Sequence, residues 1–149
     1  RYHISYHNQI WATLTNGLAA IPVWWDYPVL TEGDWDQLQI LAGFVADIDL
    51  ANHPFRPMTA SAGGTDLYVM GTGKEAFGWG RAYDSEDISG ISMTIEGMEN
   101  HTFLVTWTDP WNGNQVAGST IKAKKGKLLI TVPKMETPRP DIAFRIREI

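Results

Sequence analysis

Cysteine is absent from this 149-residue sequence. Disulfide bonds and cysteine-ligated zinc sites are therefore excluded, but the compartment is not fixed, because many exported proteins contain no disulfide. The sequence also lacks an apolar run of about 18 residues, so we expect no membrane-spanning helix. No signal peptide is visible, and because the chain begins at Arg1 rather than methionine, we expect a mature, trimmed or excised piece.

The sequence also has fewer positively charged than negatively charged residues. The chain has 12 lysine and arginine residues against 17 aspartate and glutamate residues, which gives a formal net charge of -5. This balance offers no electrostatic basis for binding nucleic acid or an anionic membrane. With 44% hydrophobic and 19% charged residues, the chain is expected to fold around an apolar core, as one ordinary domain or as a small domain plus a remnant.

Sequence motifs for several catalytic and metal-binding classes are missing as well. There is no HExxH pattern, so His3 and His7 are not expected to bind a metal; a helix-start histidine that hydrogen-bonds a loop is the simpler interpretation. No G-x-S-x-G elbow supports a serine hydrolase. Glu32 is the only glutamate near the aromatic stretch described next, but beside Gly33 it is more typical of a solvated loop than of a catalytic acid. We therefore expect no metal and no cofactor.

The most informative stretch is Ala19–Tyr27, which reads AAIPVWWDY. Its apolar part suits a buried strand over Ala20–Trp25, because a parallel strand covered on both faces is nearly continuously apolar. Adjacent residues of a strand point to opposite sides, so one tryptophan can pack the core while the other presents a flat face to a sugar ring. The alternative is a buried strand with a tryptophan plug. The aromatic and acidic residues at its end are Trp24, Trp25, Asp26 and Tyr27.

Apolar residues recur at helical spacing on both sides of this stretch. Tyr6–Leu18 has one apolar face and ends at Asn16-Gly17, a pair typical of a helix C-terminus. Asp34–Asp47 begins at a good N-cap residue, Asp34, which Gln37 can complete as a capping-box-like pair. The first fifty residues therefore predict helix, strand and helix. A single strand is not stable as a sheet, so this part requires partner strands that the sequence does not contain.

Residues 51–64 differ from both neighbouring regions. Pro54, Pro57 and the Gly63-Gly64 pair interrupt any apolar period, so we interpret this segment as a linker. The chain then divides into an N-terminal unit over residues 1–50 and a C-terminal unit over residues 65–149.

The C-terminal unit is β-rich in pattern. Short runs alternate apolar and polar residues, with turn signals between them, which predicts an all-β antiparallel sandwich. A tight hairpin is expected at Lys125-Gly126, between strands over Ser119–Lys124 and Leu128–Val132. The residues expected to face the core are Ile91, Met93, Phe103, Val105, Trp107, Phe144 and Ile146.

Three short motifs follow one another in an informative order: His7-Asn8-Gln9-Ile10-Trp11-Ala12, then Asn16-Gly17, then Trp24-Trp25-Asp26. In this order they resemble the last part of a clan A, cellulase-like (β/α)8 glycoside hydrolase, where an HN-x-x-W helix start and a WWD strand end are common. The later segment resembles the β-sandwich that many of these enzymes carry at the C-terminus. Its matching features are Tyr68-Val69, Gly97, Val105–Asp109, Gly113, Leu128–Pro133 and Asp141-Ile142-Ala143.

The resemblance implies an α/β barrel remnant (helix–strand–helix) followed by an all-β antiparallel sandwich. Tyr6–Leu18 would be the seventh barrel helix, Ala20–Trp25 the eighth strand and Asp34–Asp47 the eighth helix. Such enzymes use two glutamates about 5 Å apart in the retaining mechanism. Both lie on strands that would precede Arg1. The resemblance therefore implies that this chain contains no catalytic residue and is inactive alone.

The resemblance also implies a set of substrate-binding residues and partners. Trp24 or Trp25 would stack on the sugar, Asp26 would hydrogen-bond its hydroxyls beside Tyr27, and His7 and Asn8 would lie near the barrel mouth. The partners implied are a carbohydrate and the remaining barrel portion, supplied by a separate polypeptide or replaced by self-association of this chain. A secreted location, extracellular or periplasmic, is implied as well.

Two other functions stay open: a free-standing carbohydrate-binding module and a purely structural sandwich. A binding module requires exposed aromatic residues on the sandwich, and Trp79 and Trp111 are the candidates because glycine or turn residues flank them. A calcium site is a further possibility, because Asp109, Asn112 and Asn114 place three oxygen-bearing side chains in one turn. Their spacing is not that of an EF-hand loop, so a structural turn is our interpretation.

Overall fold

The computed structural model describes residues 2–18 and 31–149. Within these ranges the helices are α1 (Tyr2–Thr15) and α2 (Glu32–Val45). The strands are β1 (Arg56–Pro57), β2 (Ala60–Ala62), β3 (Thr65–Gly71), β4 (Glu75–Ala82), β5 (Ser92–Glu96), β6 (Thr102–Thr108), β7 (Gln115–Lys122), β8 (Lys127–Thr131) and β9 (Asp141–Glu148). The predicted strand over Ala20–Trp25 lies outside the described residues.

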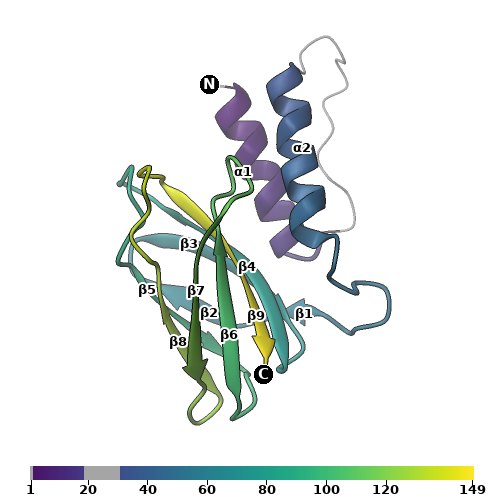
Figure 1. The fold of residues 1–149 in the computed structure, drawn as a ribbon, viewed down its shortest axis with the longest axis vertical. Helices are drawn as coiled ribbons and strands as arrows, with labels where there is room; N and C mark the ends of the chain where they lie inside the picture. Colours follow the sequence, from purple (N-terminus) through teal and green to yellow (C-terminus); the bar gives the residue numbers. More distant parts are fainter. Residues whose placement is uncertain (1, 19–30) are drawn as a thin grey trace.

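The strands form two sheets that pack against each other, with the two helices at one end of the molecule (Figure 1). The larger sheet has the strand order β1-β3-β4-β9-β6-β7, and the smaller has the order β2-β5-β8. Every strand pair within them is antiparallel. The antiparallel sandwich predicted for the C-terminal unit is therefore confirmed.

The main core lies between the two sheets. Strand β6 alternates strictly between half-buried and buried residues along its length, which is the signature of a strand with one face on the core. Six of the seven residues predicted to face inward are at most 1% exposed. The seventh, Ile91, is half-buried and packs against the same cluster. The period-two pattern thus identified the inner face of the sandwich correctly.

The hairpin predicted at Lys125-Gly126 is wrong in its pairing. The turn exists, with both residues at positive φ (53° and 75°). However, β7 pairs with β6 in the larger sheet, whereas β8 pairs with β5 in the smaller one. Only a single bridge, between Lys124 and Lys127, spans the turn. The chain therefore crosses from one sheet to the other here.

The segment predicted as a linker, residues 51–64, contains two short strands. β1 pairs with β3 through Arg56 and Pro57, and β2 pairs with β5 through residues Ala60–Ala62. The segment passes from the larger sheet to the smaller and adds an edge strand to each. Its prolines and short strands suit edge positions, where a missing backbone donor is tolerated.

The helix boundaries differ from those predicted, for reasons of capping. α2 begins at Glu32, which was expected in a loop, and its N-cap is Thr31 rather than Asp34. Asp34 is instead the third helical residue, and it forms a capping box with Thr31. The carboxylate of Asp34 accepts from the backbone N–H of Thr31 at 2.8 Å, and the backbone N–H of Asp34 faces the Thr31 side chain. α1 extends over Tyr2–Thr15, so it begins and ends earlier than the predicted Tyr6–Leu18.

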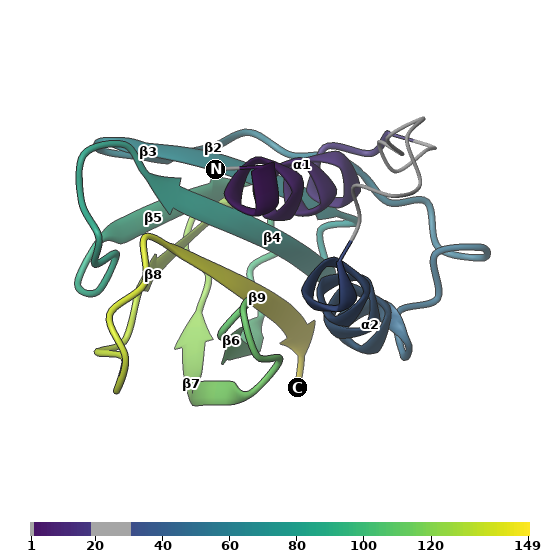
Figure 2. The same ribbon diagram turned by 90° about the horizontal axis from the view of Figure 1, so that it is seen from above.

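Both helices lie on the outer face of the larger sheet, where α1 crosses above β3 and β4 (Figure 2). A second apolar core forms between them and the sheet. Trp11 and Leu41 are buried there, at 0% and 4% exposure. Leu18, which follows α1, is 63% exposed. Among the described residues, no helix is long and apolar enough to cross a membrane.

Candidate functional site

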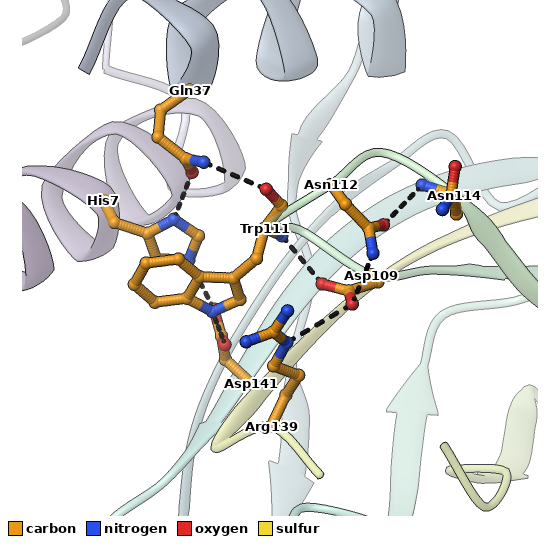
Figure 3. Close-up of polar contacts among 8 residues, drawn as sticks. All are labelled: His7, Gln37, Asp109, Trp111, Asn112, Asn114, Arg139 and Asp141. Atoms are coloured by element: carbon orange, nitrogen blue, oxygen red, sulfur yellow. Dashed lines mark hydrogen bonds and ion pairs between the residues drawn. The ribbon is translucent and has the colours of Figure 1, made fainter. Parts of the chain in front are cut away.

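The most unusual polar feature lies between α1 and the larger sheet (Figure 3). His7 projects from α1 and Asp141 is the first residue of β9; the side chains of both are 0% exposed. Nε2 of His7 lies 2.7 Å from Oδ2 of Asp141. A buried carboxylate is costly unless donors surround it, so the other contacts of Asp141 decide whether this pair is stable.

Two tryptophans complete the donors around Asp141. Trp79 donates from Nε1 to Oδ2 at 2.8 Å, and Trp111 donates from Nε1 to Oδ1 at 2.8 Å. With His7, the carboxylate accepts three hydrogen bonds across its two oxygens. Bonds to an ionised acceptor are stronger than neutral ones, so this arrangement satisfies the buried carboxylate.

The hydrogen-bond inventory also fixes the proton on Nδ1 of His7. Nε2 of Gln37 lies 3.1 Å from the backbone oxygen of Trp111, and a carbonyl only accepts, so the amide NH2 of Gln37 faces Trp111. The amide oxygen of Gln37 then lies 2.5 Å from Nδ1 of His7, which donates to it. The other ring nitrogen, Nε2, forms the hydrogen bond with the Asp141 carboxyl group, so both nitrogens of His7 have a partner.

Trp111 stacks on this ring and joins the sandwich loops to it. Its ring centroid lies 3.8 Å from that of His7, with an interplanar angle of 11°. The Arg139 guanidinium lies 5.9 Å from the centroid of the Trp111 ring, within the range of a cation–π contact. The ring of Trp111 is therefore in contact with both His7 and Arg139, and the residue is half-buried.

The turn before β7 holds Trp111 in place. Asp109 accepts from the backbone N–H of Trp111 at 2.8 Å, from Nδ2 of Asn112 at 3.1 Å and from Nε of Arg139 at 3.3 Å. Asn112 in turn accepts from the backbone N–H of Asn114 at 2.8 Å. These bonds confirm the structural turn predicted for the three residues. No cluster of three His, Cys, Asp or Glu side chains suited to a metal occurs within residues 2–18 and 31–149.

A second histidine–carboxylate contact joins the two helices. Nδ1 of His3 on α1 lies 2.8 Å from Oδ1 of Asp34 on α2. Burial acts to raise the pKa of Asp34, but hydrogen bonds from the Thr31 backbone, His3 and the Thr31 hydroxyl outweigh it and hold that pKa below its ordinary value. Burial, and then the charge of Asp34, raise the pKa of Tyr6.

The structure separates the predicted substrate-binding residues into two groups. Trp24, Trp25, Asp26 and Tyr27 lie outside the described residues, so their role stays a prediction. His7 and Asn8 are on α1; Asn8 is half-buried, and His7 uses both ring nitrogens in the joint with the sheet. In this arrangement His7 offers no polar atom to a sugar.

The aromatic candidates on the sandwich have different outcomes. Trp79 is 2% exposed and bonded to Asp141, so its assignment to an exposed binding surface is wrong. The glycines that flank it, Gly78 and Gly80, are buried strand residues rather than turn residues.

Asp141 and Gln37 were missed as members of the site. The available signal for Asp141 was a charged residue directly before the apolar run Ile142–Phe144.

The contacts of this site are structural, because they connect the two helices to the larger sheet. A histidine paired with a carboxylate is a common catalytic element, but it requires a nucleophile or substrate within reach of the ring. Here the ring and the carboxylate are both 0% exposed. The arrangement holds α1 and α2 against β4 and β9 with charge-assisted bonds. A scan of protein-family models and a search of curated proteins found no match to this chain.

Proposed function

We propose that this chain is the C-terminal portion of a secreted glycoside hydrolase that acts on a polysaccharide or oligosaccharide. The two helices, with the strand predicted over Ala20–Trp25, are the last elements of a (β/α)8 barrel, and the sandwich is the appended domain. The chain contributes one wall of the substrate cleft through Trp24–Tyr27, at the strand end where barrel enzymes place their active sites. It contains neither catalytic glutamate.

The observation that carries the proposal is the packing of the two helices against the sandwich. Their sequences bracket the WWD motif, and they pack side by side on the larger sheet. The buried His7–Asp141 pair connects the helices to this sheet. In the proposal, this contact orients the last two barrel helices, and through them the strand predicted over Ala20–Trp25. Sites held on rigid elements keep their geometry better than sites on free loops.

The outer surface of α1 also supports the proposal. Ile4 is 53% exposed on this helix, and Leu18, just after its end, is 63% exposed. Burial of one such side chain stabilises a protein by about 1.5–3 kcal/mol. In the proposal, the remaining barrel portion covers these positions, from a separate polypeptide or through self-association of this chain.

The binding-module alternative receives less support. It required exposed aromatic faces at Trp79 and Trp111, but Trp79 is buried. One face of Trp111 stacks on His7, and Arg139 lies over its ring. Neither tryptophan therefore presents the open ring face that a sugar would use.

The first test asks what the chain is bound to and whether the assembly hydrolyses a polysaccharide. Protein purified from its source should be analysed by intact mass and sedimentation, and then assayed for release of reducing sugar. We expect a co-purifying barrel portion and measurable turnover. Trp25→Ala should lower kcat/KM about tenfold or more, which corresponds to a loss of about 1.4 kcal/mol of transition-state binding.

The isolated 149-residue chain is the matched control. It should release no reducing sugar, because both catalytic glutamates are supplied from outside it. Turnover by the pure chain that disappears in Glu32→Gln or Asp26→Asn would overturn the proposal. Unchanged turnover and affinity in both Trp24→Ala and Trp25→Ala assemblies would overturn the assignment of the cleft wall.

A further inference from the structure

The helices leave part of the outer sheet face uncovered. α1 contacts β3 and β4, and α2 lies beside α1. The sheet continues past α2 into β6 and β7, where the outward residues that line the space beside α2 are small or polar. Thr106 on β6 pairs with Gly118 on β7, and Thr108 pairs with Gln115. A groove of about 660 Å3 lies here, between α2 and the sheet.

Five of the thirteen residues that line the groove have uncharged hydrogen-bonding side chains. Amides and hydroxyls both donate and accept, as sugar hydroxyls do. Ile40 and Phe44 of α2 add apolar surface that suits the C–H groups of a sugar ring. The uncharged polar residues in the lining are Gln39, Thr106, Thr108, Asn112 and Gln115.

The basic residues of the groove are already paired. Beyond the end of α2, Asp47 forms an ion pair with Arg145, and its second oxygen lies 3.7 Å from Nη1 of Arg147. Asp36 adds a further carboxylate to the lining. Two arginines and two aspartates leave no excess positive charge, so the groove suits a neutral ligand better than an anionic one.

The same lining is less suited to a polypeptide. Protein partners are usually anchored by large side chains that enter apolar pockets. In this groove the apolar residues are Ile40 and Phe44, and Phe44 is only 7% exposed because it belongs to the second core. The groove also lies over the face of the sheet, so it offers side chains rather than the unpaired backbone of an edge strand.

We propose that this groove, between α2 and the outward faces of β6 and β7, binds a segment of a neutral polysaccharide. The inference rests on the proposed function and deepens it, because it adds a second contact with the polymer besides the wall at Trp24–Tyr27. The volume lies within the range of about 300–1,000 Å3 found for small-molecule sites, enough for a short segment of sugar chain.

Gly43 provides a sharp test. It lines the groove from α2, and a Cβ placed on it would meet no atom within 4 Å. Gly43→Tyr should therefore fill the groove without a clash, and most residues favour a helix more than glycine does. Gly63, in the turn before β3, also has no atom within 4 Å of its built Cβ, so Gly63→Tyr is the matched control.

The experiment is native affinity electrophoresis of the 149-residue chain in gels that contain a soluble β-glucan, xylan, mannan or polygalacturonate. At least one neutral polymer should retard the wild type. Gly43→Tyr should weaken that retardation at least tenfold, and Gly63→Tyr should not change it. No retardation by any neutral polymer, retardation by polygalacturonate alone, or equal retardation of Gly43→Tyr would each overturn the inference.

Two further readouts separate this inference from others. If Gly43→Tyr keeps its polysaccharide binding but releases a co-purifying polypeptide in sedimentation, the groove is a protein contact and the inference is overturned. In the source-purified assembly, Gly43→Tyr should leave hydrolysis of a short oligosaccharide unchanged. An inactive assembly whose groove still binds a neutral polymer would overturn the proposed hydrolase function and leave the groove assignment standing.

Discussion

Nε2 of His7 lies 2.7 Å from Oδ2 of Asp141, although 134 residues separate the two in the sequence. Both side chains are fully buried, and together they connect the first helix to the last strand. Because Trp79, Trp111 and Gln37 satisfy the remaining polar atoms, the pair has the complete hydrogen bonding that buried polar side chains require.

Breaking this pair should be costly. Asp141→Asn replaces the carboxyl group with an amide, which keeps only one acceptor oxygen for the three groups that contact Asp141. We expect a loss of about 3–5 kcal/mol in the free energy of unfolding, as is typical when one partner of a buried pair is removed. Urea unfolding followed by tryptophan fluorescence measures it.

The exposed pair between Lys127 and Glu96 is the control for that experiment. Their side chains are 57% and 44% exposed, with a separation of 2.6 Å. Glu96→Gln should cost no more than about 1 kcal/mol, because water screens exposed pairs. Similar losses in Asp141→Asn and Glu96→Gln would show that the His7–Asp141 joint does not contribute as proposed.

The proton assigned to Nδ1 of His7 can be observed directly. The amide oxygen of Gln37 faces this nitrogen, so a long-range 1H–15N spectrum of the folded protein should show Nδ1 of His7 protonated. Gln37→Leu keeps the helix and removes the acceptor at Nδ1, and should destabilise the fold by about 1–3 kcal/mol through the unsatisfied donor. A spectrum without a proton on Nδ1 would contradict the assignment.

The capping box of α2 predicts a loss of stability in acid. The pKa of Asp34 is lowered from its ordinary value of 3.8, so folding favours the carboxylate form. Its contribution is therefore complete above pH 3.8 and is lost as the pH falls through the lowered pKa. The stability difference between the wild type and Asp34→Asn should shrink in that acidic window.

Urea unfolding at a series of pH values tests this prediction. His3→Gln should reduce the acid-dependent part, because the ring of His3 is one of the donors that lower the pKa of Asp34. A difference between the wild type and Asp34→Asn that stays constant from neutral pH into the acidic window would be incompatible with this role of the capping box.

The sequence predicted the inner face of the sandwich because that pattern is local. On a strand, burial alternates with period two, so Phe103, Val105 and Trp107 could be assigned to the core from their own run. The turn at Lys125-Gly126 was also local and was found. The sheet to which each flanking strand belongs depends on distant partners, so the pairing across that turn could not be predicted from it.

The contact between His7 and Asp141 also depends on distant partners, so it could not be predicted. His7 stood in a helix motif and Asp141 in a strand motif, and nothing local to either indicates the other. Trp79 was misassigned because its flanking glycines suggested an exposed position on the sandwich, whereas Gly78 and Gly80 lie inside a buried strand. Glycine there serves close packing between layers rather than a change of chain direction.

Gly78 yields the last prediction. It pairs with Phe144 on β9, and a Cβ built on it would lie 2.5 Å from Cζ of that ring and 2.8 Å from the backbone oxygen of Tyr68. The ring is buried in the main core, and the Tyr68 oxygen belongs to the neighbouring strand β3, so neither can move freely. Gly78→Ala should therefore lower the free energy of unfolding by about 1–3 kcal/mol, as overpacking does. Gly118→Ala on β7, whose built Cβ meets no atom closer than 3.8 Å, should be neutral or slightly stabilising. Equal unfolding midpoints for the two variants in urea would show that β4 and β9 do not pack this closely at Gly78.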